Sequence, residues 1–462
     1  MNITYKPNVN GYLPKPPPVL MTPWLILALF SHPAMDAQAA VERPSVATLQ
    51  AQVGDLQTRV SRLEEQLTNV LKVVQQDGGG SRSAAAPVRD IVTVKEQARI
   101  PQPSIQLGGR IKVDGIYNSR TGGAGSNRNQ GDLSFVSGNV PLDGAGKRDQ
   151  LNFSARETRI WVTAQVPTAA ATLGAYVEAD FYSADDSGNE KVSNSYVPRM
   201  RHAYVDYGGF TAGQTWSTFM NVSAFPDMND TGGPAGIINI RQPMLRYRRD
   251  QEWGGLYLAL EQPESTLTTA AGTRVAADDE QLPDVVGKLE FTGAWGNWSL
   301  AGMVRQIRID EPGTTRSSWG AAVSAAGRIN LMAADNVRFA LSYGNVLGRY
   351  LSLNAADDCV LDVSDDIRLS EMFGAYLSYQ HWWSQTLRSS LTLGYSRADP
   401  GPVRVPGPVD INQSLFSSHL NLLWNLTSAA TIGVEWIHGE RRLEDGREGA
   451  LDRVQLTSMF RF

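Results

Sequence analysis

Short segments in which apolar and polar side chains alternate recur along the chain from Ile105 to its end. The clearest are Leu173 to Phe181, Val285 to Phe291, Phe339 to Tyr343, Leu387 to Tyr395, Phe416 to Trp424 and the last ten residues, Arg453 to Phe462. A strand of this kind has one apolar and one polar face, and about ten residues of tilted strand cross a bilayer. The recurring period of two therefore predicts an all-β fold that separates lipid from water, a transmembrane β-barrel.

The connections between these segments support this fold, because their lengths alternate as well. We count about sixteen segments, which start near residues 105, 151, 172, 198, 209, 244, 255, 284, 297, 317, 336, 369, 385, 414, 429 and 450. Short turns are expected at 167–171, 208–209, 250–254, 293–296, 331–335, 383–385 and 427–428, and long polar loops at 119–150, 184–197, 216–243, 263–283, 310–316, 347–368, 398–413 and 440–449. This layout is typical of bacterial outer-membrane barrels. Residues 105–462 are thus predicted to form a 16-stranded antiparallel barrel whose two ends lie in the periplasm.

Residues 1–39 have the features of a secretory signal peptide. The apolar stretch 19–30 is too short to span a bilayer. Lys6 and Lys15 precede it, and the small residues of Ala37-Gln-Ala39 follow it as a cleavage site. We therefore expect an exported protein, and the long Pro-rich start leaves the true start codon and the cleavage site open.

A heptad repeat follows within residues 45–77. Apolar residues recur there at alternating steps of four and three, at Leu49, Val53, Leu56, Val60, Leu63, Leu67, Val70 and Val74. So narrow a stripe buries little surface in a lone amphipathic helix, and it favours an α-helical coiled coil between copies of the chain. Residues 78–104 begin with glycines, are rich in Ser, Ala and Pro, and are expected to form a flexible linker before the barrel.

The composition argues against several other classes of protein. A formal net charge of -5 without a clustered basic run gives no support for nucleic-acid binding. The one cysteine, Cys359, excludes a disulfide within the chain and is expected as a surface thiol in an Asp-rich loop. Four histidines lie on separate strands without metal-ligand spacing or a serine motif: His202, His381, His419 and His438. We therefore expect no metal site, no cofactor and no enzyme such as a barrel lipase.

A barrel of sixteen strands encloses a lumen that side chains do not fill, so a water-filled channel is the first function to consider. Three strands carry arginines in one band, roughly 9 to 16 Å from the short turns, namely Arg159, Arg201 and Arg246 with Arg248. By the alternation of side chains along a strand, four further cations are also expected to face the lumen: Arg110, Lys112, Arg338 and Arg388. Because charge at the narrowest level of a pore concentrates ions of opposite sign, we predict a basic wall that favours anions. The alternative is that an aqueous interior merely tolerates these charges.

The third long loop, Ser217 to Gln242, is too apolar to stand in solvent, with Phe225 and the segment 237–240 among its residues. If it folds back into the lumen, these groups are buried, and Asp227 and Asp230 lie opposite the arginines. Such a transverse field would orient a dipolar or anionic solute. The alternative is an external loop that packs at a subunit interface.

The chain resembles the DcaP-like family of outer-membrane porins and, more distantly, the general trimeric porins. The resemblance rests on Arg201-His-Ala-Tyr204, on Ala212-Gly-Gln-Thr-Trp-Ser-Thr-Phe219, on Ile105-Gln-Leu-Gly-Gly-Arg-Ile-Lys-Val-Asp114 and on the coil before the barrel. It implies a homotrimer in outer-membrane lipid, with a periplasmic coiled coil, that takes up small anionic solutes such as dicarboxylic or aromatic acids. It also implies that Arg159, Arg201 and Arg246 face acidic residues in the segment 226–232, and it supports the inward placement of Arg201, whose parity is ambiguous.

Two other functions remain open from the sequence. A sugar- or oligosaccharide-specific porin also carries amino-terminal coils and lines its path with aromatic residues, for which Tyr176, Tyr182 and Tyr376 are candidates. In a structural envelope anchor, the barrel would only hold the coil at the membrane. The sequence does not identify the solute, the pore diameter or whether the coil binds peptidoglycan.

Overall fold

The computed structural model describes residues 102–121, 133–182, 196–269, 271–277, 279–311, 314–331, 334–361, 366–401 and 410–462. By its contacts the chain divides into Met1–Gln97 and Ala98–Phe462, and all described residues belong to the second unit. The predicted signal peptide 1–39, the predicted coiled coil 45–77 and the predicted linker up to residue 101 lie outside the described residues.

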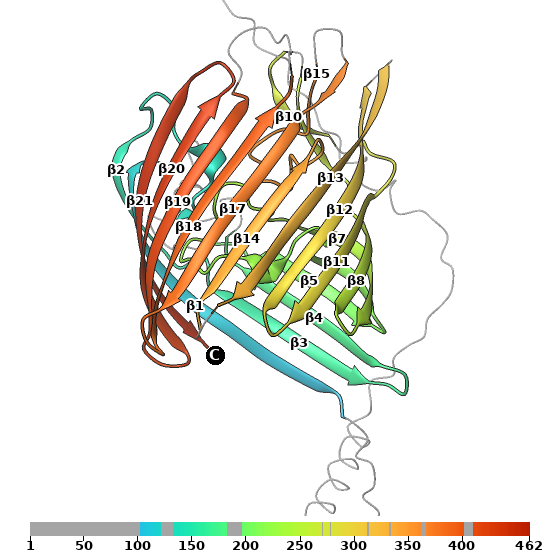
Figure 1. Cartoon of the computed structure of the whole chain (residues 1–462), viewed down its shortest axis with the longest axis vertical. Coiled ribbons are helices and arrows are strands. Elements are labelled where there is room, and N and C mark those ends of the chain that lie inside the picture. Colours follow the sequence, from blue (N-terminus) through green and yellow to red (C-terminus); the bar gives the residue numbers. More distant parts are fainter. Residues whose placement is uncertain are drawn as a thin grey trace, which may run out of the picture. The chain divides into compact units, whose positions relative to one another are not determined.

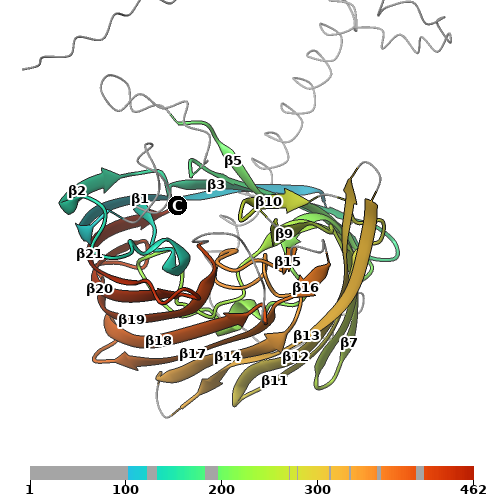
Figure 2. The ribbon, with the colours of Figure 1, turned by 90° about the horizontal axis from the view of Figure 1, so that it is seen from above.

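The described residues form a closed antiparallel β-barrel, which appears as a ring when seen from above (Figures 1 and 2). The strands of its wall are β1 (Ser104–Arg120), β2 (Arg148–Ser154), β3 (Arg159–Pro167), β4 (Thr172–Asp180), β5 (Arg199–Tyr207), β6 (Phe210–Trp216), β7 (Arg241–Gln251), β8 (Gly254–Glu261), β11 (Asp284–Gly293), β12 (Gly296–Glu311), β13 (Thr314–Asn330), β14 (Asn336–Gly344), β17 (Glu371–Trp382), β18 (Leu387–Asp399), β19 (Asn412–Asn425), β20 (Ala430–Leu443) and β21 (Glu448–Arg461). β2 and β3 are two parts of one crossing, because both pair with β1 and only residues 155–158 separate them. The wall therefore has sixteen strands, which confirms the predicted all-β barrel.

The barrel closes between its first and last strands. β1 pairs with β21 over residues 110–118, and Gly109 and Phe462 exchange two backbone hydrogen bonds of 3.0 and 3.1 Å near the short turns. Two of the predicted long loops, 310–316 and 440–449, are wrong. Pairing of β12 with β13 continues to Glu311 opposite Thr314, and pairing of β20 with β21 continues to Arg442 opposite Glu448. Backbone hydrogen bonds thus extend these strands through segments whose polar composition suggested loops.

The alternation of side chains matches the two faces of the wall. In β8, Leu256, Leu258 and Leu260 are exposed on the outer face, whereas Tyr257 and Ala259 between them are buried on the inner face. An outer band of exposed aliphatic residues is what contact with lipid requires. No helix among the described residues is long and apolar enough to cross a membrane.

Aromatic rings gather on the wall near the short turns. Phe291 stacks on Trp298 with ring centroids 4.5 Å apart, and Trp253 lies 4.9 Å from Phe291. Phe210 and Tyr247 form a second pair with centroids 4.7 Å apart. Rings of this kind suit the boundary between hydrocarbon and water, because they combine an apolar body with a polar edge.

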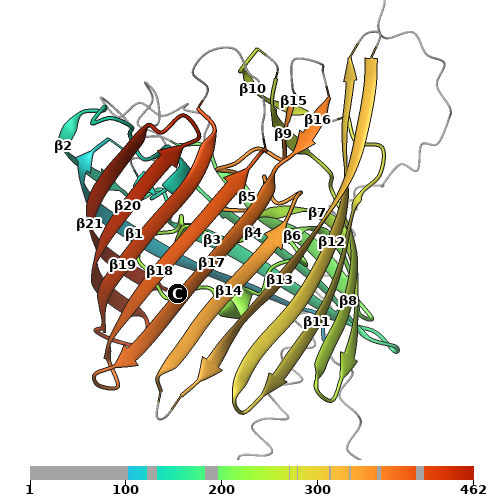
Figure 3. The ribbon, with the colours of Figure 1, turned by 45° about the horizontal axis from the view of Figure 1, so that its top comes forward.

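At the long-loop end, two loops join into a small second sheet that lies over one side of the barrel mouth (Figures 2 and 3). Its strands are β9 (Ser265–Thr268), β10 (Arg274–Ala277), β15 (Cys359–Leu361) and β16 (Ile367–Leu369). Cys359 is fully buried there, because β15 pairs with β9 on one edge and β16 on the other. The prediction of a surface thiol is therefore wrong, and burial raises the pKa of the Cys359 thiol.

Beneath this sheet, packed side chains fill one side of the barrel. The apolar cluster combines residues of the wall, the third loop and the small sheet, among them Phe219, Leu267, Ile307, Leu347 and Tyr350. Within the same region, the buried guanidinium of Arg305 is held by Asp284 at 2.9 Å and by Asp358 at 2.8 Å. The open space therefore lies toward the other side of the lumen, along β1, β3 to β5 and β18 to β21.

Candidate functional site

The third loop, residues 217–240, lies inside the barrel, as its hydrogen bonds with the inner wall show. Near its start, the amide nitrogen of Asn221 donates to the Ser299 hydroxyl of β12 at 3.1 Å. Further on, the hydroxyl of Tyr376 on β17 donates to the carbonyl oxygen of Ala224 at 2.9 Å. The loop thus crosses the lumen as expected, and the alternative of an external loop does not hold.

Two carboxylates pin the tip of this loop to the wall. Asp227 Oδ2 accepts a hydrogen bond of 2.5 Å from Nε of Arg388. Asp230 is buried and accepts from Nη1 of Arg453 at 3.1 Å and from the backbone N–H of Phe135 at 2.9 Å. Burial raises the pKa of the Asp230 carboxyl, against the lowering effect of the Arg453 guanidinium. Both carboxylates are therefore engaged by neighbouring residues and fix the position of the loop.

Close packing of the loop against the wall depends on Gly236. Its φ is +81°, and a Cβ atom there would lie 2.3 Å from the carbonyl oxygen of Tyr395 and 2.6 Å from the backbone of Ala375. An L side chain is strained at this φ and would push the loop away from β17 and β18. Glycine at this position thus lets the loop lie directly on the barrel wall.

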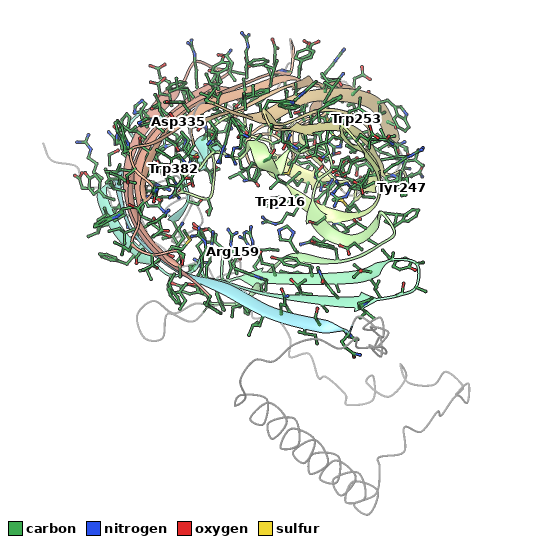
Figure 4. The ribbon with its side chains drawn as sticks, turned by 60° about the horizontal axis from the view of Figure 1, so that its bottom comes forward. Arg159, Trp216, Tyr247, Trp253, Asp335 and Trp382 are labelled. Carbon is green, nitrogen blue, oxygen red and sulfur yellow. The ribbon has the colours of Figure 1, made fainter. Side chains whose placement is uncertain are left out.

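Between the loop and the barrel wall lies a cavity of about 360 Å³, which we refer to as the constriction. In Figure 4, Arg159 and Trp216 lie at the rim of the central opening, and Trp382 lies at the wall on another side of it. The constriction is lined by eight cations, Arg110, Lys112, Arg159, Arg199, Arg201, Arg241, Arg388 and Arg461, and by four carboxylates, Glu157, Asp180, Asp227 and Asp230. Among the residues that line the constriction, cations therefore outnumber carboxylates by eight to four.

The carboxylates of the wall are each shared by several cations. Glu157, between β2 and β3, is bound by three of them, Arg110, Lys112 and Arg159. Asp180 on β4 is bound by two, Arg199 at 2.8 Å and Arg201 at 3.1 Å. Arg201 and Arg159 also pair with Glu178 of β4, and Lys112 pairs with Asp114. These ion pairs order the five cations and compensate most of their charge, so the uncompensated charge of the constriction lies on other arginines.

Two of the lining arginines, Arg241 and Arg461, make neither an ion pair nor a side-chain hydrogen bond with any described residue. The guanidinium of Arg241 lies over the ring of Trp216, 4.5 Å from its centroid, and Trp216 meets Phe225 edge-on at 5.5 Å. A cation on an aromatic face is held in place by the ring quadrupole without being neutralised. The constriction therefore offers free positive charge beside a flat apolar surface.

Two further cavities adjoin the constriction. Toward the long loops, a cavity of about 920 Å³ shares Val136 and Leu353 with it. Toward the short turns, a cavity of about 490 Å³ shares Asp227, Arg388 and Arg461 with it. The three cavities therefore follow one another along the barrel, and each shares lining residues with the next.

The structure brings some of the predicted site residues together and separates others. Five predicted cations and both predicted carboxylates line the constriction: Arg110, Lys112, Arg159, Arg201, Arg388, Asp227 and Asp230. Lys112 is only 3 % exposed and donates to the carbonyl oxygen of Asn229 at 2.6 Å, so it also anchors the loop. Arg338 lines the cavity near the short turns. Arg246 and Arg248 line neither cavity, and Arg248 pairs with Asp250 at 2.7 Å.

Several lining residues were not predicted from the sequence. Arg461 could have been found, because it shares its parity with the inward-facing Thr457 of the same strand. Arg241 shares its parity with the outward-facing Leu245 and Tyr247, so alternation alone places it against lipid. It nevertheless lines the constriction, because it is the first residue of β7 after the loop leaves the lumen.

The tyrosines proposed for a sugar path do not form a ladder. Tyr182 and Tyr376 are 6 % and 5 % exposed, and Tyr376 lies under the third loop. Tyr176 uses its hydroxyl to donate to Glu178 at 2.7 Å. The rings of Tyr182 and Tyr376 therefore present little surface to a solute, whereas Tyr176 is only partly buried.

Comparison with protein families identifies the chain. A family model described as DcaP outer membrane protein matches residues 37–462. The chain belongs to this family. Family and fold together make it an outer-membrane channel protein of the porin type. A comparison with curated proteins gives no match.

Several solved porin structures are similar to this DcaP family member. The outer membrane channel DcaP of Acinetobacter baumannii superimposes with a TM-score of 0.64 at 21% sequence identity, over 78% of this chain and 98% of that chain. The anion-selective porin from Comamonas acidovorans gives a TM-score of 0.48 at 11% identity, over 78% of this chain and 100% of that chain. The trimer form of OmpT of Vibrio cholerae gives 0.48 at 9% identity, over 78% and 100% of the two chains. The first of these similarities supports the barrel architecture derived above.

Proposed function

We propose that this porin passes small anionic solutes by diffusion, in particular dicarboxylic or aromatic acids, and that it performs no catalysis. The observation that carries the proposal is the excess of cations at the constriction, where eight basic side chains meet four carboxylates. Guanidinium groups bind carboxylates through paired N–H donors, so they recognise the charged end of such acids. In a narrow passage with low-dielectric walls, the same charges raise the local concentration of anions and lower that of cations.

The surroundings of Arg241 support acids that carry a flat ring. Its free guanidinium lies over the ring of Trp216, which in turn contacts Phe225 in a T-shaped arrangement. A carboxylate that reaches Arg241 brings the rest of the solute against these two rings. Offset and edge-to-face contacts between rings each contribute about 0.5 to 1.5 kcal/mol beyond area burial. This arrangement favours an aromatic acid over an aliphatic acid of equal charge.

The sugar-specific alternative lacks support from the tyrosines on which it rested, because two of the three are buried. A structural anchor alone does not require the series of three adjoining cavities lined by polar groups. Passive transport therefore accounts for more of the described features than either rival.

The assembly and the amino-terminal segments complete the proposal. We infer a homotrimer in the outer membrane, with a coiled coil over residues 45–77 in the periplasm and a signal peptide over residues 1–39 that is removed on export. The heptad stripe supports this assembly, because so narrow a stripe buries little surface in a single helix. Cross-linking of the purified full-length porin tests it, and a monomeric product would contradict it.

The selectivity is tested in planar bilayers with the purified full-length porin. Reversal potentials in a potassium chloride gradient should show that chloride is more permeant than potassium. A variant with Arg159→Gln and Arg241→Gln should lose most of this preference, and Glu157 keeps two cations, Arg110 and Lys112, in that variant. Arg248→Gln is the matched control, because Arg248 lines neither described cavity and is half exposed. Addition of a dicarboxylate should reduce the chloride current by competition. A cation-selective wild type would refute the proposal.

A further inference from the structure

The cavity near the short turns has an unusual concentration of arginines. It measures about 490 Å³, and its described lining includes Arg328, Arg338, Arg388 and Arg461 with a single carboxylate, Asp227. Three of the arginines lie within a few residues of a short turn, since β13 ends at Asn330, β14 begins at Asn336 and β18 begins at Leu387. Short turns face the periplasm in outer-membrane barrels. This cavity is therefore the periplasmic mouth of the pore.

Two of these arginines stand directly opposite each other in the sheet. Arg328 of β13 is the register partner of Arg338 of β14. Like charges at directly opposed positions destabilise an antiparallel pair. Arg338 directs its donors to neutral oxygens, those of the Asn336 side chain at 2.9 Å and of the Phe225 backbone. Nε of Arg328 is buried and has no hydrogen-bond partner among the described residues. Neither arginine thus forms an ion pair with a described residue.

The one lining carboxylate, Asp227, is shared among these arginines, since its charge acts on Arg338 and Arg461 as well. Asp227 is already bound by Arg388 at 2.5 Å and by the amide of Gln380 at 2.6 Å. Arg461 makes no ion pair among the described contacts and lies within electrostatic reach of Arg388. Four guanidinium groups against one carboxylate leave three positive charges around the cavity. A solute with more than one negative charge would balance this excess best.

The shape of the donor set also favours a compact anion. The guanidinium of Arg388 is backed by the ring of Trp382, 5.1 Å from its centroid, and its Nη1 donates to Asn425 at 2.9 Å. The arginines come from β13, β14, β18 and β21, so they approach the cavity from different parts of the wall. Each guanidinium binds two oxygens of an anion, and groups that approach from several directions can together bind a tetrahedral phosphate, whereas a single carboxylate offers only two oxygens in one plane.

We propose that the periplasmic mouth is a second anion-binding site that takes a compact polyvalent oxyanion, such as hydrogen phosphate or the phosphate group of a small monoester. This inference rests on the proposed function, because it assumes that anions reach the mouth through the basic constriction. Asp227, Arg388 and Arg461 belong to both cavities, so an anion passes from one site to the next without leaving the arginines. Two sites in series let one bound anion repel another, which speeds release from each.

The test uses the purified full-length porin in planar bilayers at low potassium chloride and a pH of about 8, where phosphate is mostly a dianion. Hydrogen phosphate should reduce the chloride current in a concentration-dependent manner, and acetate at matched ionic strength should reduce it much less. Phosphate added to the compartment that faces the short turns should act at lower concentration than phosphate on the other side. The double variant Arg328→Gln with Arg338→Gln should weaken the phosphate block at least fivefold and should lower the chloride preference less than Arg159→Gln with Arg241→Gln does, because both arginines lie outside the constriction.

A second variant tests the same site in case the double variant does not fold. Arg461→Gln removes a cation that has no described ion pair, so the wall should fold normally, and it should weaken the phosphate block about threefold. Arg248→Gln is the control, and phosphate should block its chloride current at the same concentration as in the wild type. An unblocked wild type, or equal block of the wild type and the double variant, would overturn the second site while leaving the anion preference intact. A cation-selective wild type would instead overturn the proposed function together with the inference that rests on it.

Discussion

Replacement of Arg241 by glutamine should lower the anion preference of the pore by an amount that depends on salt. Arg241 makes no ion pair with a described residue, so its removal leaves no carboxylate without a partner. Glutamine retains a polar side chain on the ring of Trp216. The change therefore removes one positive charge from the constriction and little else.

The size of the effect follows from the dimensions of the constriction. A sphere of about 360 Å³ has a radius of roughly 4.4 Å, so an anion at its centre lies about 6 Å from a guanidinium on the wall. A unit charge at about 6 Å in water contributes about 0.7 kcal/mol, and screening at 0.1 M salt reduces this to about 0.4 kcal/mol. That energy raises the local anion concentration about twofold and lowers the cation concentration by the same factor. Loss of Arg241 should therefore reduce the permeability ratio of chloride to potassium roughly fourfold at 0.1 M and less than about 1.5-fold at 1 M, where the Debye length is about 3 Å.

Reversal potentials of the wild type, Arg241→Gln and the control Arg248→Gln, measured around 0.1 M and again around 1 M potassium chloride, provide the assay. The reasoning fails if the loss of selectivity is the same at both salt concentrations, since a rearranged lumen rather than a missing charge would then be responsible. It also fails if the control, whose arginine lies outside the described lining of the constriction, loses as much selectivity as Arg241→Gln.

Two further predictions concern the packing that shapes the lumen. Asp230→Asn removes the ion pair with Arg453 and the charged acceptor of the Phe135 N–H, so it should weaken the anchoring of the third loop by about 1.5 to 3 kcal/mol, which bilayer recordings should register as increased open-channel noise; current as quiet as that of the wild type would contradict this. Arg305→Met leaves Asp284 and Asp358 buried without their cation and should destabilise the folded state by about 3 to 5 kcal/mol, so that the folded form is lost at a lower temperature on a denaturing gel. An unchanged transition temperature would show that this ion pair is dispensable.

The barrel could be predicted from the sequence because its wall obeys a local rule. Each crossing strand alternates between lipid and lumen, as Leu256, Leu258 and Leu260 show in β8, and this alternation is visible in any window of a few residues. The inward fold of the third loop could also be predicted, because its apolar residues are too many for a solvated loop. Both inferences depend on side-chain chemistry that short segments display by themselves.

The details of the site could not be predicted by this rule, because they depend on contacts between distant segments. Arg241 has outward parity and still lines the constriction, since the strand ladder ends there and the chain turns into the lumen. Cys359 sits in a polar loop and is buried only because β9, from another loop, pairs with it. Lys112 has the predicted parity, but the loop covers it. The sequence carries no local sign of these three placements.

The seam between the first and last strands has a consequence for biogenesis. The carboxylate of Asp114 in β1 accepts a hydrogen bond of 2.6 Å from Thr457 in β21, across a separation of 343 residues. Contacts between residues so far apart in the sequence form late in folding, because closing the long loop between them costs chain entropy. The cylinder therefore stays unsealed until the carboxyl terminus has been exported. A polypeptide that ends before β21 would leave the edges of β1 and β20 unpaired, and unpaired strand edges are templates for aggregation. Closure of the barrel therefore depends on the presence of β21.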